Sequence, residues 1–202
     1  MSAAQRRIRN VLLAMTFASW GVLRFVSAES VEDRWSVGQL APCALHFVAA
    51  WLFLVRSPSL QEGSVGDIAA AIPSFVAGGV IMLLAPEPST WPLTAQVIFV
   101  TGATGAVLSL LSLGKSFAIF PALREVVSRG PYRLVRHPAY LFELVMLIGA
   151  LLSCGWQVGL LLPVAVALFV LRIVTEERVL NLSPSYRLYC EKVRYRLVPL
   201  IW

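Results

Sequence analysis

Charged residues are scarce in this sequence: they occupy only 14% of its 202 positions, whereas globular proteins carry roughly a quarter. Hydrophobic residues make up 58% of the chain. This balance excludes an ordinary water-soluble domain. It predicts an all-α, polytopic membrane protein in which the few charged residues stand between apolar runs.

Histidine and cysteine are also rare, and their rarity excludes the common metal centres. His46 and His137 are the only histidines, and the three cysteines, Cys43, Cys154 and Cys190, lie far apart without a CxxC pair. No metal site is therefore predicted. A glycine-rich dinucleotide fingerprint is absent as well.

The net charge of +6 does not indicate a nucleic-acid partner. Such a partner needs basic residues gathered on one solvated face, and here they stand in the gaps between apolar runs. With the N-terminus inside, the internal segments hold nearly all of the 17 basic residues, and the external loops hold only Arg34. The positive-inside rule then places both termini in the cytoplasm, and we expect the inner or plasma membrane of a prokaryote.

Four apolar runs in the first half predict membrane-spanning helices, at 11–28, 38–55, 65–85 and 93–113. The first holds about 18 residues, or ~27 Å of helix, and we interpret it as a retained span. The fourth carries small residues at Gly102, Gly105 and Ala106, which predict close packing against another helix of the same chain. Pairing of two chains there is the alternative, so we expect a monomer or a weak homodimer.

A further apolar stretch, 139–173, extends for about 35 residues, and as one helix of ~52 Å it would overshoot the bilayer. It must fold back, and Cys154-Gly155-Trp156 is the plausible turn. The arms of the resulting hairpin are 139–153, which is short for a span, and 157–178. Together these runs predict six spans in a single domain, with 1–113 as scaffold and 114–202 as the functional part.

Polar residues concentrate at 129–143, which reads RGPYRLVRHPAYLFE. Because proline disfavours helix in the residue before it, His137 should turn and Pro138 should open the next helix. His137, Tyr140 and Glu143 border a span, where ionisable residues mark a site by default. Arg124 and Arg129 are interpreted as positive-inside markers and contacts to anionic lipid.

A second cluster, Glu176-Glu177, ends the last apolar run. Arg172 and Glu176 are four residues apart and share one helix face. A structural interpretation pairs these two and lets Glu177 meet an arginine of the 129–136 segment. We expect His137 and Glu177 to line one cytoplasmic-side cavity, and His46 to bond to a neighbouring helix.

Four motifs of the C-terminal half occur in order. They are GPYRLVRHPAY at 130–140, EERVL at 176–180, Tyr186-x-x-Tyr189 and Arg196-Leu-Val-Pro199. Over roughly 113–202 the chain resembles the isoprenylcysteine carboxyl methyltransferase family. That family belongs to a wider group of integral-membrane methyltransferases that includes phospholipid N-methyltransferases.

The resemblance implies an S-adenosylmethionine-dependent methyltransferase that acts on a lipophilic acceptor among the membrane lipids. By position, it implies cofactor contacts from His137, Pro138 and Tyr140, a border between cofactor and acceptor at Glu176 and Glu177, and closure of the pocket by Tyr186 and Tyr189. We add Arg136 to the predicted cofactor site, and we predict a catalytic group of Glu176, Arg172 and Arg133. A carboxylate acceptor, as in a prenyl-cysteine, would be oriented by Arg172 or Arg133, whereas an amine or hydroxyl acceptor would need His137 or Glu176 as a base.

Two departures from the family pattern concern the acceptor pocket. Phe142 stands where many relatives have glycine, and segment 182–184 lacks the usual phenylalanine. Two other functions stay open: a membrane NADPH-dependent reductase of the sterol type, and a non-enzymatic lipid-binding or transport component. The acceptor itself, whether prenyl-cysteine, phospholipid, quinone, hopanoid-like lipid or small thiol, is open too.

Overall fold

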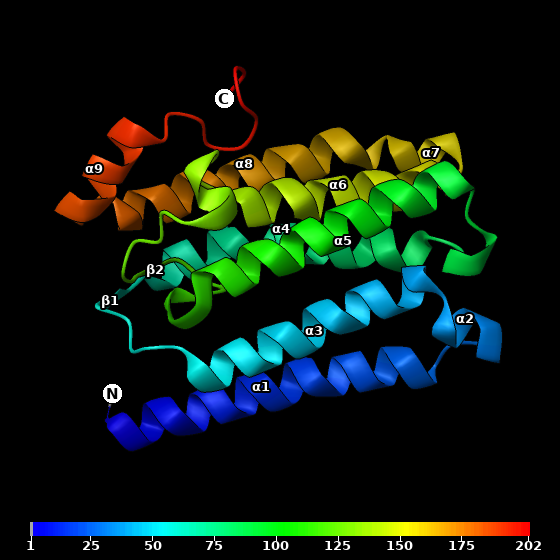
Figure 1. The fold of residues 1–202 in the computed structure, drawn as a ribbon, viewed down its shortest axis with the longest axis horizontal. Helices are drawn as coiled ribbons and strands as arrows, with labels where there is room; N and C mark the ends of the chain where they lie inside the picture. Colours follow the sequence, from blue (N-terminus) through cyan, green and yellow to red (C-terminus); the bar gives the residue numbers. More distant parts are fainter. Residues whose placement is uncertain (1) are drawn as a thin grey trace.

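In the computed structural model, which describes residues 2–202, long helices lie side by side along one common direction (Figure 1). The elements follow one another as α1 (Ala3–Val26), α2 (Val31–Trp35), α3 (Val37–Val55), β1 (Gln61–Glu62), α4 (Val65–Leu84), η1 (Pro88–Thr90), α5 (Leu93–Leu113), η2 (Gly114–Ser116), β2 (Ala122–Leu123), η3 (Gly130–Arg133), α6 (Pro138–Leu152), α7 (Trp156–Gly159), α8 (Leu161–Leu180) and α9 (Pro184–Lys192).

Four helical segments are long and apolar enough to cross a membrane: Val37–Val55, Val65–Leu84, Leu93–Ser116 and Trp156–Leu180. The prediction of several spans is confirmed for these four. Helix α6 is apolar, but its 15 residues give about 22 Å, less than the hydrocarbon core. Helix α1 has 24 residues with arginines near both ends. The total of six spans therefore stays a prediction.

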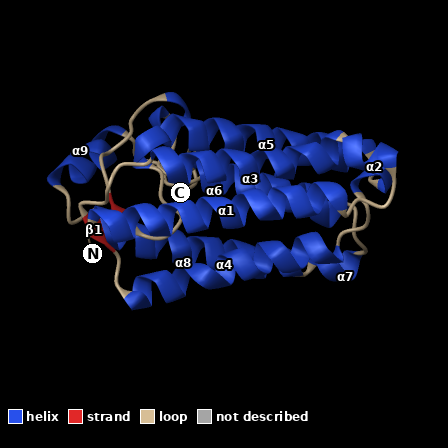
Figure 2. Ribbon diagram, turned by 90° about the horizontal axis from the view of Figure 1, so that it is seen from below, coloured by secondary structure: helices blue, strands red, loops and turns tan. Residues whose placement is uncertain are grey.

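The predicted hairpin is confirmed. Helix α6 ends at Leu152, residues 153–155 form the turn, and the chain returns through α7 and α8. The sequence did not indicate the short helix α2, in the linker between α1 and α3, or the antiparallel pair β1–β2, which joins Gln61 to Leu123. This pair lies at the end of the bundle that also holds α9 and the N-terminus, whereas α2 and α7 lie at the opposite end (Figures 1 and 2).

Helices α5 and α6 pack closely because glycines remove side chains from their interface. A Cβ at Gly102 would lie 2.5 Å from the backbone nitrogen of Met146, and one at Gly149 would lie 2.7 Å from that of Phe99. The predicted close packing of the small-residue stripe within the chain is therefore confirmed. Phe142 fills the space above Gly105, where a Cβ would lie 2.2 Å from its ring.

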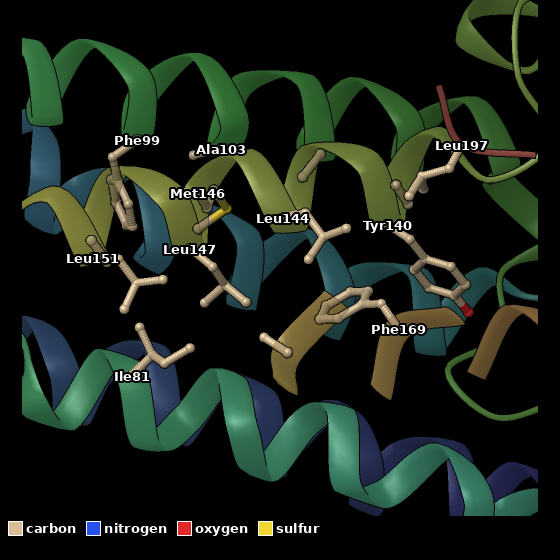
Figure 3. Close-up of a cluster of buried hydrophobic side chains, with 14 of the residues drawn as sticks. Ile81, Phe99, Ala103, Tyr140, Leu144, Met146, Leu147, Leu151, Phe169 and Leu197 are labelled. Atoms are coloured by element: carbon tan, nitrogen blue, oxygen red, sulfur yellow. The ribbon is translucent and has the colours of Figure 1, made fainter. Parts of the chain in front are cut away.

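The main hydrophobic core lies between α5, α6 and α8 and extends to α4 through Ile81. Figure 3 shows its side chains, with Tyr140 and Phe169 next to each other at one end of the cluster. Their ring centroids are 6.1 Å apart. The polar residues described below begin where this core ends, at the hydroxyl of Tyr140.

The α5–α6 contact generates a stability prediction. Gly149→Ala should lower the free energy of unfolding by about 1–3 kcal/mol, because the added methyl group overpacks against a backbone that has no room to move. The thermal midpoint of the detergent-solubilised protein measures the effect. Gly79→Ala is the matched control, since no atom lies within 4 Å of its added Cβ; equal midpoints for the two variants would contradict the close packing.

Candidate functional site

The segment before α6 is held in place by backbone geometry and by the C-terminal tail. Gly130 has φ of +57° and faces Ser112, a conformation and a close approach that favour glycine. After the turn η3, the backbone amides of Arg136 and His137 donate to the carbonyls of Tyr195 and Arg196, at 2.9 and 2.8 Å. Helix α6 then begins at Pro138, as predicted.

Glu177 is buried in α8 and accepts hydrogen bonds from four side chains of other segments. Arg136 NH1 lies 2.8 Å and His137 Nε2 3.3 Å from its Oε1. Tyr186 donates to the same oxygen at 3.3 Å, and Arg196 Nε lies 2.7 Å from Oε2. The interpretation that Glu177 meets an arginine of the 129–136 segment is thus confirmed, and Arg196 is a second partner that the sequence did not indicate.

Glu176, the next residue, points elsewhere. The hydroxyl of Tyr140 donates to its Oε2 at 2.5 Å, and His137 Nδ1 lies 4.0 Å from the same oxygen. The rings of His137 and Tyr140 stack with their planes 3° apart. Because a carboxylate only accepts, Nε2 of His137 carries a proton toward Glu177, and the imidazole stands between the two carboxylates.

Arg172 departs from the predicted i, i+4 pair with Glu176. Its NH1 lies 3.5 Å from Glu143 Oε2 on α6, so the expected partner was wrong. The guanidinium is sandwiched between the rings of Phe75 and Tyr140, with Cζ 4.0 and 4.2 Å from their centroids. This cation–π contact from both sides holds the group away from its own helix neighbour.

A cavity of about 290 Å³ opens beside these groups. Its polar lining at this end comprises Tyr132, Arg136, His137, Tyr140, Glu143, Arg172, Glu176, Tyr186 and Tyr189. Its apolar lining comes largely from earlier helices and includes Phe17, Leu45, Ala49, Leu110, Leu113 and Phe117. The volume is near the ~300 Å³ lower limit of ligand pockets.

Four residues singled out from the sequence do not border this cavity. The expectation that His137 and Glu177 both line one cavity was wrong for Glu177: it lies behind His137 and contacts it, and only His137 faces the cavity. Arg133 is exposed, and Pro138 is buried at the start of α6. Phe142 lies against Gly105 instead, so the departure from glycine there shapes the α5–α6 contact and not the cavity wall.

Helix α9 covers one side of the cavity with two tyrosines. Tyr189 donates to the carbonyl of Tyr132 at 2.7 Å, and Tyr186 donates to Glu177. Burial is the main cause that raises the pKa of both phenols well above the usual value. Both therefore stay protonated and act as donors across the physiological range.

His46 also lines the cavity, from α3. Its Nδ1 lies 2.6 Å from the carbonyl of Pro42, four residues earlier in the same helix. The expected bond to a neighbouring helix was therefore wrong. A carbonyl cannot donate, so Nδ1 carries the proton and the other ring nitrogen is an acceptor when the ring is neutral.

The four hydrogen bonds to Glu177 can be tested by substitution. Glu177→Gln should cost roughly 3–5 kcal/mol of stability, because it removes the buried charge that pairs with Arg136 and Arg196. Limited proteolysis should also cut the tail near Arg194 faster, since Arg196 loses its anchor. The control Glu191→Gln removes an exposed carboxylate on α9 and should change neither readout; wild-type behaviour of Glu177→Gln would show that the tail is held by other contacts.

Comparison with known proteins gives one family. Residues 92–183 match the sequence model of the phospholipid methyltransferase family, whereas no curated protein and no solved structure matches the chain. The matched region begins just before α5 and ends after α8, so it contains His137, Tyr140 and Glu176. The resemblance inferred from the motifs is thereby confirmed: over this region the chain is similar to phospholipid methyltransferases, a family of integral-membrane methyltransferases related to the isoprenylcysteine methyltransferases.

Proposed function

We propose that the protein is an S-adenosylmethionine-dependent methyltransferase whose acceptor is a lipophilic molecule of the membrane. The observation that carries the proposal is Glu176, a partly open carboxylate bonded to Tyr140 within the family-matched region, at the polar end of a largely apolar cavity. Six spans and a cytoplasmic site belong to the same proposal, because basic residues mark the cytoplasmic side of a membrane protein and Arg124, Arg136 and Arg172 line the cavity.

The residues around the cavity fit this cofactor chemically. A sulfonium and an ammonium group favour carboxylates and aromatic faces, which Glu176, Glu143 and Tyr140 supply. A carboxylate favours guanidinium forks, and the Nε atoms of Arg136 and Arg172 are buried without a hydrogen-bond partner among the described residues. When bound, the cofactor supplies an electrophilic methyl group.

The chain's own residues would orient the acceptor and exclude water. Methyl transfer depends mainly on holding donor and acceptor in line. Arg172, fixed between two rings, can direct an anionic acceptor group, whereas Glu176 and His137 can take a proton from an amine or hydroxyl. Arg133 is not suited to orient an acceptor in this cavity because its side chain is exposed.

The apolar side chains that line the cavity would contact the lipophilic part of the acceptor. Phe17 and Ala49 come from α1 and α3, before the matched region, and Leu113 and Phe117 from the end of α5 and the segment after it. An apolar ligand gains about 25 cal/mol for each Å² it removes from water. A prenyl or acyl chain beside Phe117 would place its polar end toward Arg172 and Glu176.

Cofactor binding tests the proposal directly. Equilibrium dialysis of the detergent-solubilised protein with labelled S-adenosylmethionine should show saturable binding, and Glu176→Gln should weaken it about tenfold, the effect of losing one ion contact of ~1.4 kcal/mol. Glu191→Gln, which removes an exposed carboxylate, should bind like wild type. Absence of saturable binding in several detergents would refute the proposal, and thermal stabilisation by NADPH instead would favour a reductase.

The labelled product would define the acceptor class. Incubation of native membranes with methyl-labelled S-adenosylmethionine should label the lipid extract, and Tyr140→Phe should slow labelling at least tenfold because Glu176 loses its fixed donor. Alkali releases a methyl ester as volatile methanol, whereas N-methyl groups and ethers resist it. If no labelled lipid forms although the cofactor binds, a lipid acceptor is wrong while the cofactor site stands.

A further inference from the structure

A second cavity lies at the same end of the bundle, between the start of α1 and the end of α3. It measures about 510 Å³. Five arginines line it: Arg6, Arg7, Arg9, Arg56 and Arg124. Among the described residues, no aspartate or glutamate does so. Arg124 is the only one of these arginines in the family-matched region, and it also lines the first cavity; the other four lie in α1 and directly after α3.

Neutral groups of the protein hold two of these guanidiniums, those of Arg56 and Arg124, in position. Arg56 donates through Nε and NH2 to Oδ1 of Asn10, at 3.1 and 2.6 Å, and Arg124 donates to the carbonyl of Ser57. Glu62 lies near the cavity as a counter-charge, 2.9 Å from Arg9. An amide and a carbonyl orient a cation without cancelling its charge, so the cavity keeps a concentrated positive potential.

Buried donors without partners indicate a missing anion. Arg124 is 7% exposed, and its Nε has no hydrogen-bond partner among the described residues; the same holds for Nε of Arg9. Burial, followed by repulsion from Arg124 and Arg9, lowers the pKa of Arg56 to about 10. An unsatisfied buried donor and like charges held close together both cost free energy, and a bound anion would relieve both.

The position of the cavity favours an anion that belongs to the membrane. Arg56 directly follows the candidate span Val37–Val55, so the guanidiniums stand where the hydrocarbon ends. Val11 and Leu54 border the cavity and are 39% and 58% exposed, and Ile8 and Leu12 continue this exposed apolar face on α1. A soluble anion would leave this apolar face uncovered, whereas the acyl chain of a lipid would cover it.

We propose that the arginine cavity binds the phosphate of an anionic membrane lipid, whose acyl chains lie along the exposed faces of α1 and α3. Guanidinium forks match phosphate oxygens in pairs, and basic pockets between membrane helices on the cytoplasmic side bind lipid head groups. Arg124 borders both cavities, so the bound phosphate stabilises the segment that also forms a wall of the first cavity.

Lipid-dependent thermal stability tests this site in the full chain in detergent. Titration with phosphatidylglycerol should raise the unfolding midpoint, and phosphatidylcholine with the same acyl chains should raise it much less. Arg7→Gln should weaken the apparent affinity for phosphatidylglycerol about fivefold, as expected for one arginine near an anionic head group, and Arg124→Gln should abolish the stabilisation. Arg7 is exposed on α1, so its variant should fold normally.

The controls separate the possible sources of the anion. Arg187→Gln, an exposed arginine on α9, should respond to phosphatidylglycerol like wild type. Inorganic phosphate at equal concentration should give no stabilisation; a shift equal to that of phosphatidylglycerol would overturn the lipid assignment in favour of a soluble anion. Equal responses to the two lipids, or an unchanged phosphatidylglycerol affinity in Arg7→Gln, would overturn the site itself.

Discussion

The buried carboxylate of Glu177 is the group on which the arrangement of the C-terminal half depends. An ionised carboxylate away from water must be paired and hydrogen-bonded. Here the partners come from three places: Arg136 and His137 before α6, Tyr186 on α9, and Arg196 in the tail. The hydrogen bonds to this one carboxylate therefore hold three parts of the chain in place: the segment before α6, the helix α9 that covers the cavity, and the C-terminal tail.

Glu176 and Glu177 are chemically identical neighbours with different surroundings. One helical step rotates them by about 100°, which turns Glu177 toward the cluster of donors and Glu176 toward Tyr140 and the cavity. Glu177 has four side-chain donors, whereas Glu176 has one at hydrogen-bond distance. The carboxylate that still has free acceptor capacity is the one that faces the cavity, which is why the proposed chemistry rests on Glu176.

Local rules predicted much of the fold from the sequence. Apolar length and proline position gave the limits of α5, the start of α6 and the turn at residues 153–155, because these features depend on nearby residues only. The sequence also indicated that the 129–143 and 176–177 clusters meet. It did not indicate α2 or the β1–β2 pair, since two-residue strands carry no hydrophobic period.

The misassigned contacts share a different cause. Arg172 has the right spacing for an i, i+4 pair with Glu176. Its guanidinium instead contacts Phe75 from α4 and Glu143 from α6. Arg196 contacts Glu177 because the C-terminal tail returns to α8. Phe142 of α6 occupies the space left by the missing side chain of Gly105 on α5. Each of these contacts joins elements far apart in sequence, so no spacing within one element could reveal them.

The two halves of the chain line different ends of the first cavity, and this arrangement would affect which acceptors fit. Its polar end belongs almost entirely to residues after Arg129, whereas Phe17, Leu45 and Ala49 line it from α1 and α3. The match to phospholipid methyltransferases covers 92–183 and leaves those two helices outside. Under the proposed function, α1 and α3 can therefore change which apolar chain fits without altering Glu176, Tyr140 or His137. Substitutions in the apolar wall should accordingly alter the Michaelis constant for the acceptor more than the binding of the cofactor, because they touch only the apolar end of the cavity.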